Sequence, residues 1–150
     1  MCYGESHPDM DYTAFLSDIV HEPTQTEGRG FDLTVAEVYE VTAPGRVDFG
    51  GGELADATVD PHPSQKRNED DNYEWWHLDP GQYLVEYNES LTSEDMAFTL
   101  QTRDELLARG AFHPTLSVTE LPRVPLSVGG EGIRIKENAR VSTLVSADPA

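Results

Sequence analysis

Basic residues, cysteine and long apolar runs are all scarce in this sequence. Only 10 Lys and Arg stand against 28 Asp and Glu, which gives a formal net charge of -18. A chain this acidic repels phosphate backbones and anionic lipid headgroups, so nucleic acids and membranes are excluded as general partners. No stretch reaches the roughly 18 to 20 apolar residues that cross a bilayer, and the N-terminus lacks the layout of a signal peptide. We therefore expect a cytoplasmic protein.

Cysteine and lysine are rare enough to carry their own implications. Cys2 has no partner for an intramolecular disulfide, so the fold must depend on packing and hydrogen bonds. Lys66 and Lys136 are the only lysines, and the remaining basic residues are arginines. Dispersed acids suit concentrated salt, because a Debye length of about 3 Å at 1 M screens self-repulsion. The composition favours a halophilic source.

What the chain does contain is enough apolar sequence for one domain over residues 1–150, of which 37% are hydrophobic. Apolar residues at helical spacing predict one short amphipathic helix over 9–20, and Glu105 to Ala108 predict a short helix near 103–109. Glycine, proline and polar residues over about 50–79 predict a long surface excursion. Short strands are expected at 31–35, 38–41, 82–89, 96–102, 116–118, 126–128, 133–135 and 141–145. Many short strands with little helix predict a mainly β fold, either a compact distorted β-barrel or a jelly-roll-like sandwich.

Four segments, in this order, resemble the dUTPase and dCTP deaminase family. Residues 30–35 resemble its Gly-x-Asp-Leu strand, and residues 78–86 its Leu-x-Pro-Gly-x-Tyr-x-Val strand. Residues 102–110 stand where the family has Arg-Ser-Ser-Leu-x-Arg-x-Gly, and residues 133–144 resemble its closing strand pair. The resemblance implies a dUTPase-like β-clip barrel that forms a homotrimer. It also implies nucleotide sites at the subunit interfaces, with magnesium on the phosphates.

Substrate-binding residues follow from the positions that match these motifs. Arg103 is placed to hold a phosphate or a neighbouring carboxylate with two hydrogen bonds, and Arg140 stands at the arginine of the closing strand. Thr143 replaces the usual glutamine there. Asp32 is a candidate to orient a metal-bound water or an interface arginine. The alternative for each of these residues is a purely structural role.

Two acids depart from the family pattern at the phosphate cradle. Asp104 and Glu105 replace its serines, and like charges about 4 Å apart cost on the order of 4 kcal/mol at an effective dielectric near 20. A bridging Mg²⁺ would rescue triphosphate binding, which makes both acids candidate metal ligands. The plain alternative is a solvated helix start. Zinc is not expected, because no histidine has a second His or Cys at ligand spacing.

The segment that carries the family's catalytic hairpin is short here and contains no aromatic residue. Glu120 is its only carboxylate, and so the candidate general base. Nothing after Val145 resembles the glycine-rich tail of dUTPases, so we expect a site without that lid.

These observations leave three hypotheses. The first is a protein of pyrimidine deoxynucleotide metabolism that either hydrolyses dUTP to release diphosphate or deaminates dCTP. The second is a catalytically silent trimer of the same fold, kept as a binding or regulatory module. The third is a β-barrel that binds an unrelated small ligand.

Overall fold

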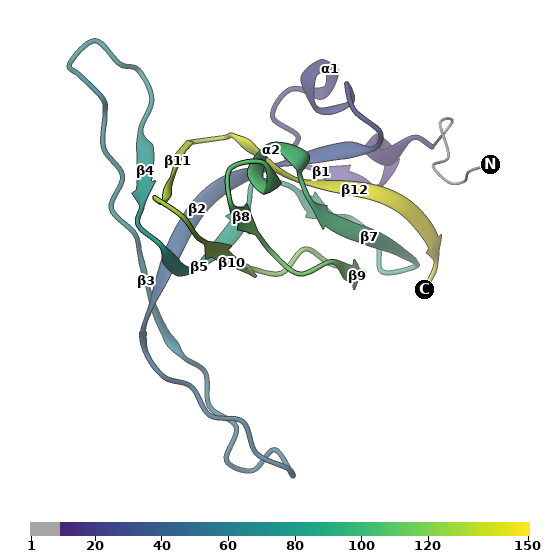
Figure 1. The fold of residues 1–150 in the computed structure, drawn as a ribbon. Helices are drawn as coiled ribbons and strands as arrows, with labels where there is room; N and C mark the ends of the chain where they lie inside the picture. The colour runs from purple at the N-terminus through teal and green to yellow at the C-terminus, as the bar shows by residue number, and fades with distance from the viewer. Residues whose placement is uncertain (1–9) are drawn as a thin grey trace.

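The computed structural model describes residues 10–150, so Cys2 lies outside the described part. The main element of this part is one curved antiparallel sheet (Figure 1). Its strand order is β8-β10-β5-β2-β12-β7-β9, and β3 pairs with the far end of β2. The bounds are β2 Phe31–Ala43, β3 Thr58–Pro61, β5 Gly81–Tyr87, β7 Met96–Thr102, β8 Ala111–Phe112, β9 Leu116–Val118, β10 Val124–Val128 and β12 Arg140–Pro149. The prediction of a mainly β fold is confirmed.

Smaller elements complete the fold around this sheet. β4 (Trp75–Leu78) and β11 (Ile133–Lys136) pair with each other, and β1 (Leu16–Ser17) pairs with β6 (Ser90–Leu91). The helices are α1 (Glu22–Gln25), α2 (Asp104–Leu107) and a 3-10 turn, η1 (Tyr12–Phe15). No helix in the described part has the length and apolar character needed to cross a bilayer.

The N-terminal segment differs from the helix expected over 9–20. It forms the η1 turn and then the short strand β1, and the helix begins only at Glu22. The Asp11 side chain caps the 3-10 turn by accepting the Thr13 N–H, and β1 finds a hydrogen-bonding partner in β6. Tyr12 and Phe15 still pack against Phe98, with ring centroids 6.2 and 5.6 Å away. Tyr12 and Leu16 are buried and Phe15 is partly buried against the core, but pairing with β6 overrode the helical period.

The core lies along β2, the central strand. Phe31, Leu33, Val35 and Val38 are all fully buried. Over Phe31–Val35 every residue is buried, on both faces of the strand. Side chains from β5, β7, β10 and β12 complete one continuous cluster. β2 is therefore a rigid base for any polar side chain that projects from it.

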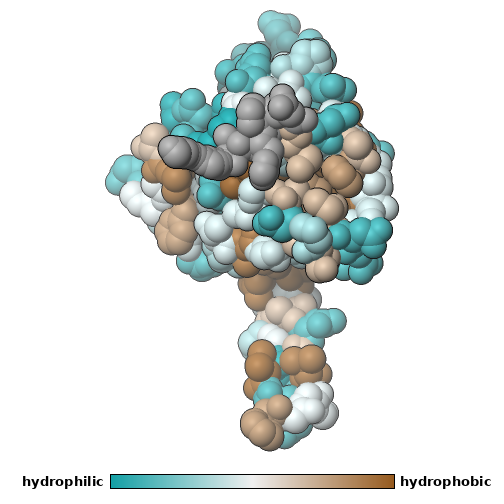
Figure 2. All heavy atoms as spheres, turned by 90° about the vertical axis from the view of Figure 1, so that its right-hand side faces the viewer, coloured by the Kyte–Doolittle hydropathy of each residue, from teal (hydrophilic) through white to brown (hydrophobic). Residues whose placement is uncertain are grey.

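The excursion expected at 50–79 contains two strands, β3 and β4, and extends from the body in two places (Figure 1). We name residues 40–60 the β2–β3 arm, whose far end carries Gly50, Gly51 and Gly52. Residues 62–74 form the β3–β4 arm. Figure 2 shows the β2–β3 arm projecting from the body with apolar residues near its end.

Candidate functional site

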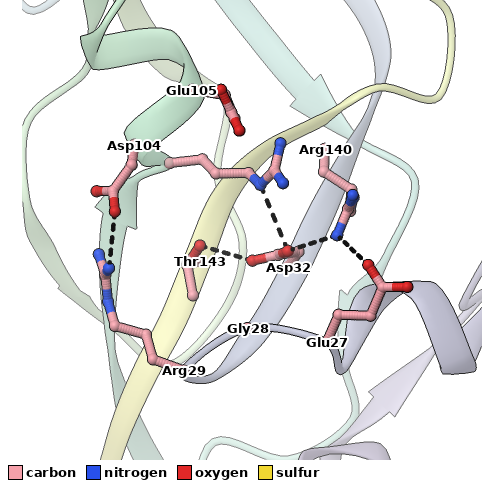
Figure 3. Close-up of a pocket in the computed structure, with 9 residues that line it drawn as sticks. Glu27, Gly28, Arg29, Asp32, Asp104, Glu105, Arg140 and Thr143 are labelled. Carbon is pink, nitrogen blue, oxygen red and sulfur yellow. Dashed lines mark hydrogen bonds and ion pairs between the residues drawn. The ribbon is translucent and has the colours of Figure 1, made fainter.

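A polar pocket of about 270 Å³ lies where four segments of the chain meet (Figure 3). These segments are the loop between α1 and β2, the start of β2, the start of α2, and β12. The pocket is lined by Glu27, Gly28, Arg29, Asp32, Arg103, Asp104, Glu105, Arg140 and Thr143. Six of the seven site residues predicted from the sequence therefore line a single pocket.

Asp32 is the centre of this pocket. Its side chain is only 5% exposed. The hydroxyl of Thr143 donates to Oδ1 at 2.7 Å. Arg140 Nη1 lies 3.2 Å from Oδ2, and Arg103 Nε lies 3.4 Å from the same oxygen. A buried carboxylate needs this kind of compensation, because the free energy of burying an unpaired charge is large.

The strand pairing explains why these side chains meet. Thr143 on β12 lies directly opposite Asp32 on β2, and Arg140 lies opposite Thr34. Gly30 lets the two backbones approach closely, because a Cβ there would lie 1.9 Å from the carbonyl oxygen of Leu144. The backbone N–H of Arg103 donates to the Val141 carbonyl at 3.0 Å, which anchors the start of α2 to β12.

The two arginines on Asp32 retain hydrogen-bonding capacity. Arg140 uses one terminal nitrogen, Nη1, for Asp32, for the Thr24 carbonyl at 3.0 Å and for Glu27 at 3.4 Å. Its other terminal nitrogen, and both of those on Arg103, have no hydrogen-bond or ion-pair partner among residues 10–150. Guanidinium groups held in this way bind carboxylates and phosphates well, since their planar forks match the geometry of paired oxygens.

Asp104 and Glu105 each pair with an arginine. Arg29 Nη1 lies 3.2 Å from Asp104, and Arg109 Nη1 lies 2.9 Å from Glu105. Both acids are exposed. No group of three or more His, Cys, Asp or Glu side chains in the described part is arranged to hold a metal ion. The described residues alone thus do not assemble a Mg²⁺ site here.

Glu120 is the one predicted site residue that lies outside this pocket. It follows β9 in a bend, is exposed, and does not line the pocket.

Sequence reasoning missed Arg29 and Glu27, which form one wall of the pocket. Both lie in a loop just before the family-like strand, where no periodic pattern marks a side chain. It also missed the buried hydrogen bonds of Gln25 and Glu89, which position this loop. Gln25 accepts the N–H groups of Val20 and His21, and it donates to the buried Glu89 at 2.7 Å.

Glu89 connects this hydrogen-bonded group to β2. It accepts the Thr34 N–H at 3.0 Å and the Thr34 hydroxyl at 2.6 Å. The α1 segment is therefore tied to β2 by buried hydrogen bonds, and the loop with Glu27 and Arg29 begins from a fixed point.

Comparisons with known proteins found relatives by sequence and a solved structure of similar fold. No family model matches the chain. A "probable deoxyuridine 5'-triphosphate nucleotidohydrolase" of Methanococcoides burtonii is 31% identical over 99 residues, covering 64% of this chain and 54% of the relative. Proteins of the same name from Halobacterium salinarum and Methanosarcina acetivorans are 37% identical over 83 residues and 28% over 136. These alignments cover 53% and 87% of this chain, and 47% and 76% of the relatives.

A solved structure has a similar fold. The 2'-deoxycytidine 5'-triphosphate deaminase of Agrobacterium tumefaciens superposes with a TM-score of 0.56 at 14% identity, over 87% of this chain and 42% of that one. The chain spans about half the length of the first two curated relatives.

Proposed function

Because this chain belongs to the dUTPase and dCTP deaminase family by sequence and fold, we propose that it acts in pyrimidine deoxynucleotide metabolism. The pocket around Asp32 takes the phosphates of a pyrimidine deoxynucleoside triphosphate. The observation that carries this proposal is the pair of guanidinium groups on Asp32, whose outer N–H groups have no partner among residues 10–150. They can bind phosphate oxygens without giving up the bonds that hold them.

The size of the pocket supports a shared site. Ligand pockets generally enclose roughly 300 to 1,000 Å³, and about 270 Å³ lies just below that range. Such a pocket has room for phosphates, while the sugar and base would need a further surface. In the homotrimer that we propose, a neighbouring subunit supplies it.

The reaction that fits the curated relatives' names is hydrolysis of dUTP. Water attacks a phosphorus atom, and diphosphate leaves with the bonding electrons. Arg103 and Arg140 would stabilise the charge that develops on the phosphate oxygens, while Asp32 holds both guanidinium groups in place. Three arginines and four carboxylates line the pocket, so the pocket has no net positive charge. Mg²⁺ bound to the triphosphate would supply positive charge. Deamination of dCTP, with water replacing the amino group, is the other reaction of this family.

A silent binding module is the second candidate, and specific observations favour it. Asp104 forms an ion pair with Arg29, and Glu105 forms one with Arg109, so these two arginines are already neutralised. Glu120, the predicted base, is exposed and outside the pocket. A site that binds phosphates without a positioned base would hold a nucleotide and not turn it over.

A thermal-shift titration in about 2 M KCl tests nucleotide binding. The ligands are dUTP, dCTP, dTTP and their monophosphates, each with and without Mg²⁺. Selective stabilisation by one triphosphate supports the site, and release of diphosphate or ammonia from it identifies the reaction. Stabilisation without turnover supports the silent module. No shift at millimolar concentration with any nucleotide would refute the proposed phosphate site.

A double variant tests the role of the two acids. Asp104→Ser with Glu105→Ser removes two negative charges from the pocket, so triphosphate affinity should rise by about tenfold or more, since even about 1.4 kcal/mol of relieved repulsion has that effect. The matched control is Glu69→Ser with Asp70→Ser, which makes the same charge change on the exposed β3–β4 arm. Equal gains in both variants would mean that only net charge matters.

A further inference from the structure

The β2–β3 arm carries apolar side chains with nothing packed on them. Val47 is 90% exposed, Leu54 is 63% exposed, and Phe49 is fully exposed. Single exposed apolar residues are ordinary, but a group of them on a projecting segment is typical of an interaction surface. Aromatic residues in particular are enriched at the centres of protein interfaces.

The end of the arm has a fixed conformation. The Asp48 carboxylate accepts the N–H groups of Gly51 and Glu53, each at 3.0 Å. Arg46 donates from Nε to the Glu53 carbonyl at 3.1 Å, and its backbone pairs with Ala55. Phe49 is held outward by this hydrogen-bonded turn, so presenting it to a partner costs little conformational entropy.

No described part of the same molecule can cover the arm. The ribbon and the space-filling view, taken at right angles, both show it extending away from the curved sheet (Figures 1 and 2). Within residues 10–150 nothing covers Phe49, which leaves its ring available to a second molecule.

The body of this chain offers a surface that matches the arm. A cavity of about 240 Å³, which we name the α2–β8 groove, is lined by Leu107 and Phe112, both about half exposed, and by Arg29 and His113. Cavities of roughly 150 Å³ already hold a benzene molecule, so a phenylalanine ring fits. Arg29, which lines the groove, already pairs with Asp104, so the match between the arm and the groove is one of size and apolar side chains.

We propose that the β2–β3 arm of one copy docks in the α2–β8 groove of a second copy, with Phe49 entering between Leu107 and Phe112. Two different surfaces meet in this contact, so it repeats around a ring or continues along a chain of copies. Apolar contacts also let so acidic a chain associate with itself, since they bring few like charges together.

This contact would bring the neighbour's arm beside the nucleotide pocket. Arg29 lines both the groove and the pocket around Asp32, so an arm in the groove borders the site. The proposal rests on the self-association included in the proposed function, and it names the surfaces that make it. It does not depend on which nucleotide is bound.

The mass of the protein in about 2 M KCl is the first test, measured by sedimentation over a range of concentrations. The wild type should be oligomeric, and Phe49→Ser should raise the dissociation constant by about 30-fold or more, as loss of a central interface aromatic does. The control is Val20→Ser, because Val20 is an apolar residue away from the arm that is 47% exposed. It should leave the mass unchanged. A monomeric wild type, or an oligomer indifferent to Phe49→Ser, would overturn the proposal.

Disulfide trapping tests the pairing itself. In a Cys2→Ser background, protein with Gly50→Cys, which keeps the Phe49 side chain and has room for a Cβ, is mixed with protein carrying Leu107→Cys and mildly oxidised. A mixed disulfide is expected with Leu107→Cys and not with Val20→Cys. An oligomer without this cross-link would refute the arm contact and leave self-association intact. A monomer that binds phosphatidylcholine vesicles through Phe49 would instead assign the arm to lipid.

Nucleotide binding is measured separately on the Phe49→Ser protein. A thermal shift that persists while the mass falls to that of a monomer leaves the phosphate site standing and confines it to one subunit. Loss of both shows that the neighbour's arm completes the site.

Discussion

At the scale of single residues, one buried carboxylate organises the candidate site. Asp32 accepts from Thr143 and faces Arg103 and Arg140, whose side chains are both 23% exposed. Removing the charge of Asp32 would leave Arg103 with no anion and Arg140 with only Glu27, 3.4 Å from its Nη1. By contrast, Glu105 and Arg109 form an exposed pair on α2, and pairs of this kind contribute little to stability.

These two acids give a matched pair of substitutions. Asp32→Asn should lower the free energy of unfolding by about 3 kcal/mol, which is typical for breaking a buried ion pair. Glu105→Gln, the same chemical change at an exposed position, should alter it by less than about 0.5 kcal/mol. Urea denaturation at a fixed salt concentration measures both. Equal effects would contradict a central role for Asp32.

His113 is a second residue whose burial has a measurable consequence. Its Nε2 lies 2.7 Å from the Ser142 hydroxyl, and its Nδ1 lies 2.8 Å from the Pro114 carbonyl. Burial lowers the pKa of His113, an effect that the bond to Pro114 opposes. The neutral ring fits this setting by donating from Nδ1 and accepting the Ser142 hydroxyl proton at Nε2.

The lowered pKa predicts a loss of stability in acid. Below about pH 6.5, the usual histidine value, the unfolded chain takes up a proton at this residue that the folded chain does not, so folding becomes less favourable as pH falls. In His113→Gln, the decrease in melting temperature between pH 8 and pH 5.5 should be smaller than in the wild type. His21→Gln, at an exposed histidine, should keep the full decrease. If His113→Gln shows the same decrease in melting temperature as the wild type, His113 is not the source of the instability in acid.

At the scale of elements, the pairing of β2 with β12 forms the floor of the site. Thr143 reaches Asp32 only because the two strands lie in this register. Gly30 permits the approach, since a side chain there would meet the backbone of Leu144. A backbone obstacle cannot move aside as the end of a flexible side chain can.

Gly30→Ala should therefore be strongly destabilising. We expect a loss of at least about 3 kcal/mol, the upper part of the range for overpacking. Gly50→Ala, at the end of the β2–β3 arm with nothing within 4 Å of an added Cβ, should change stability by less than about 0.5 kcal/mol. Chemical denaturation measures the free energy of unfolding of both variants. If Gly30→Ala is as stable as the wild type, β2 and β12 can move apart at this point without loss of stability.

The elements that sequence could predict are those whose signals are local. The strands at 96–102 and 116–118 have the predicted bounds, because polar turn residues flank short β-branched and aromatic runs. The N-terminal helix was misplaced, because Leu16–Ser17 pairs with Ser90–Leu91, and no local pattern encodes a partner so distant in sequence. The site follows the same division. Family-like motifs marked Asp32, Arg103 and Arg140, whereas Arg29 and Glu89 matter only through tertiary contacts.

At the scale of the whole molecule, charge is the dominant feature. A net charge of -18 on 150 residues destabilises the folded state, since folding brings like charges closer together. Several acids, among them Glu69, Glu94 and Glu131, are exposed and form no ion pair within residues 10–150. Their mutual repulsion depends directly on screening by salt.

Salt should therefore stabilise the protein. Between about 0.15 and 1 M the Debye length falls from about 8 Å to about 3 Å, and repulsion between surface acids falls with it. We expect the melting temperature to rise by about 10 °C or more between 0.15 and 2 M KCl, as a few kcal/mol of relieved repulsion would produce in a domain of this size. A variant with Glu69, Asp70, Glu94 and Glu131 changed to their amides should melt higher in dilute buffer and respond less to KCl. If the wild-type melting temperature is the same at both salt concentrations, the surface is not adapted to salt. If the amide variant responds as strongly as the wild type, KCl acts through apolar burial and not through screening.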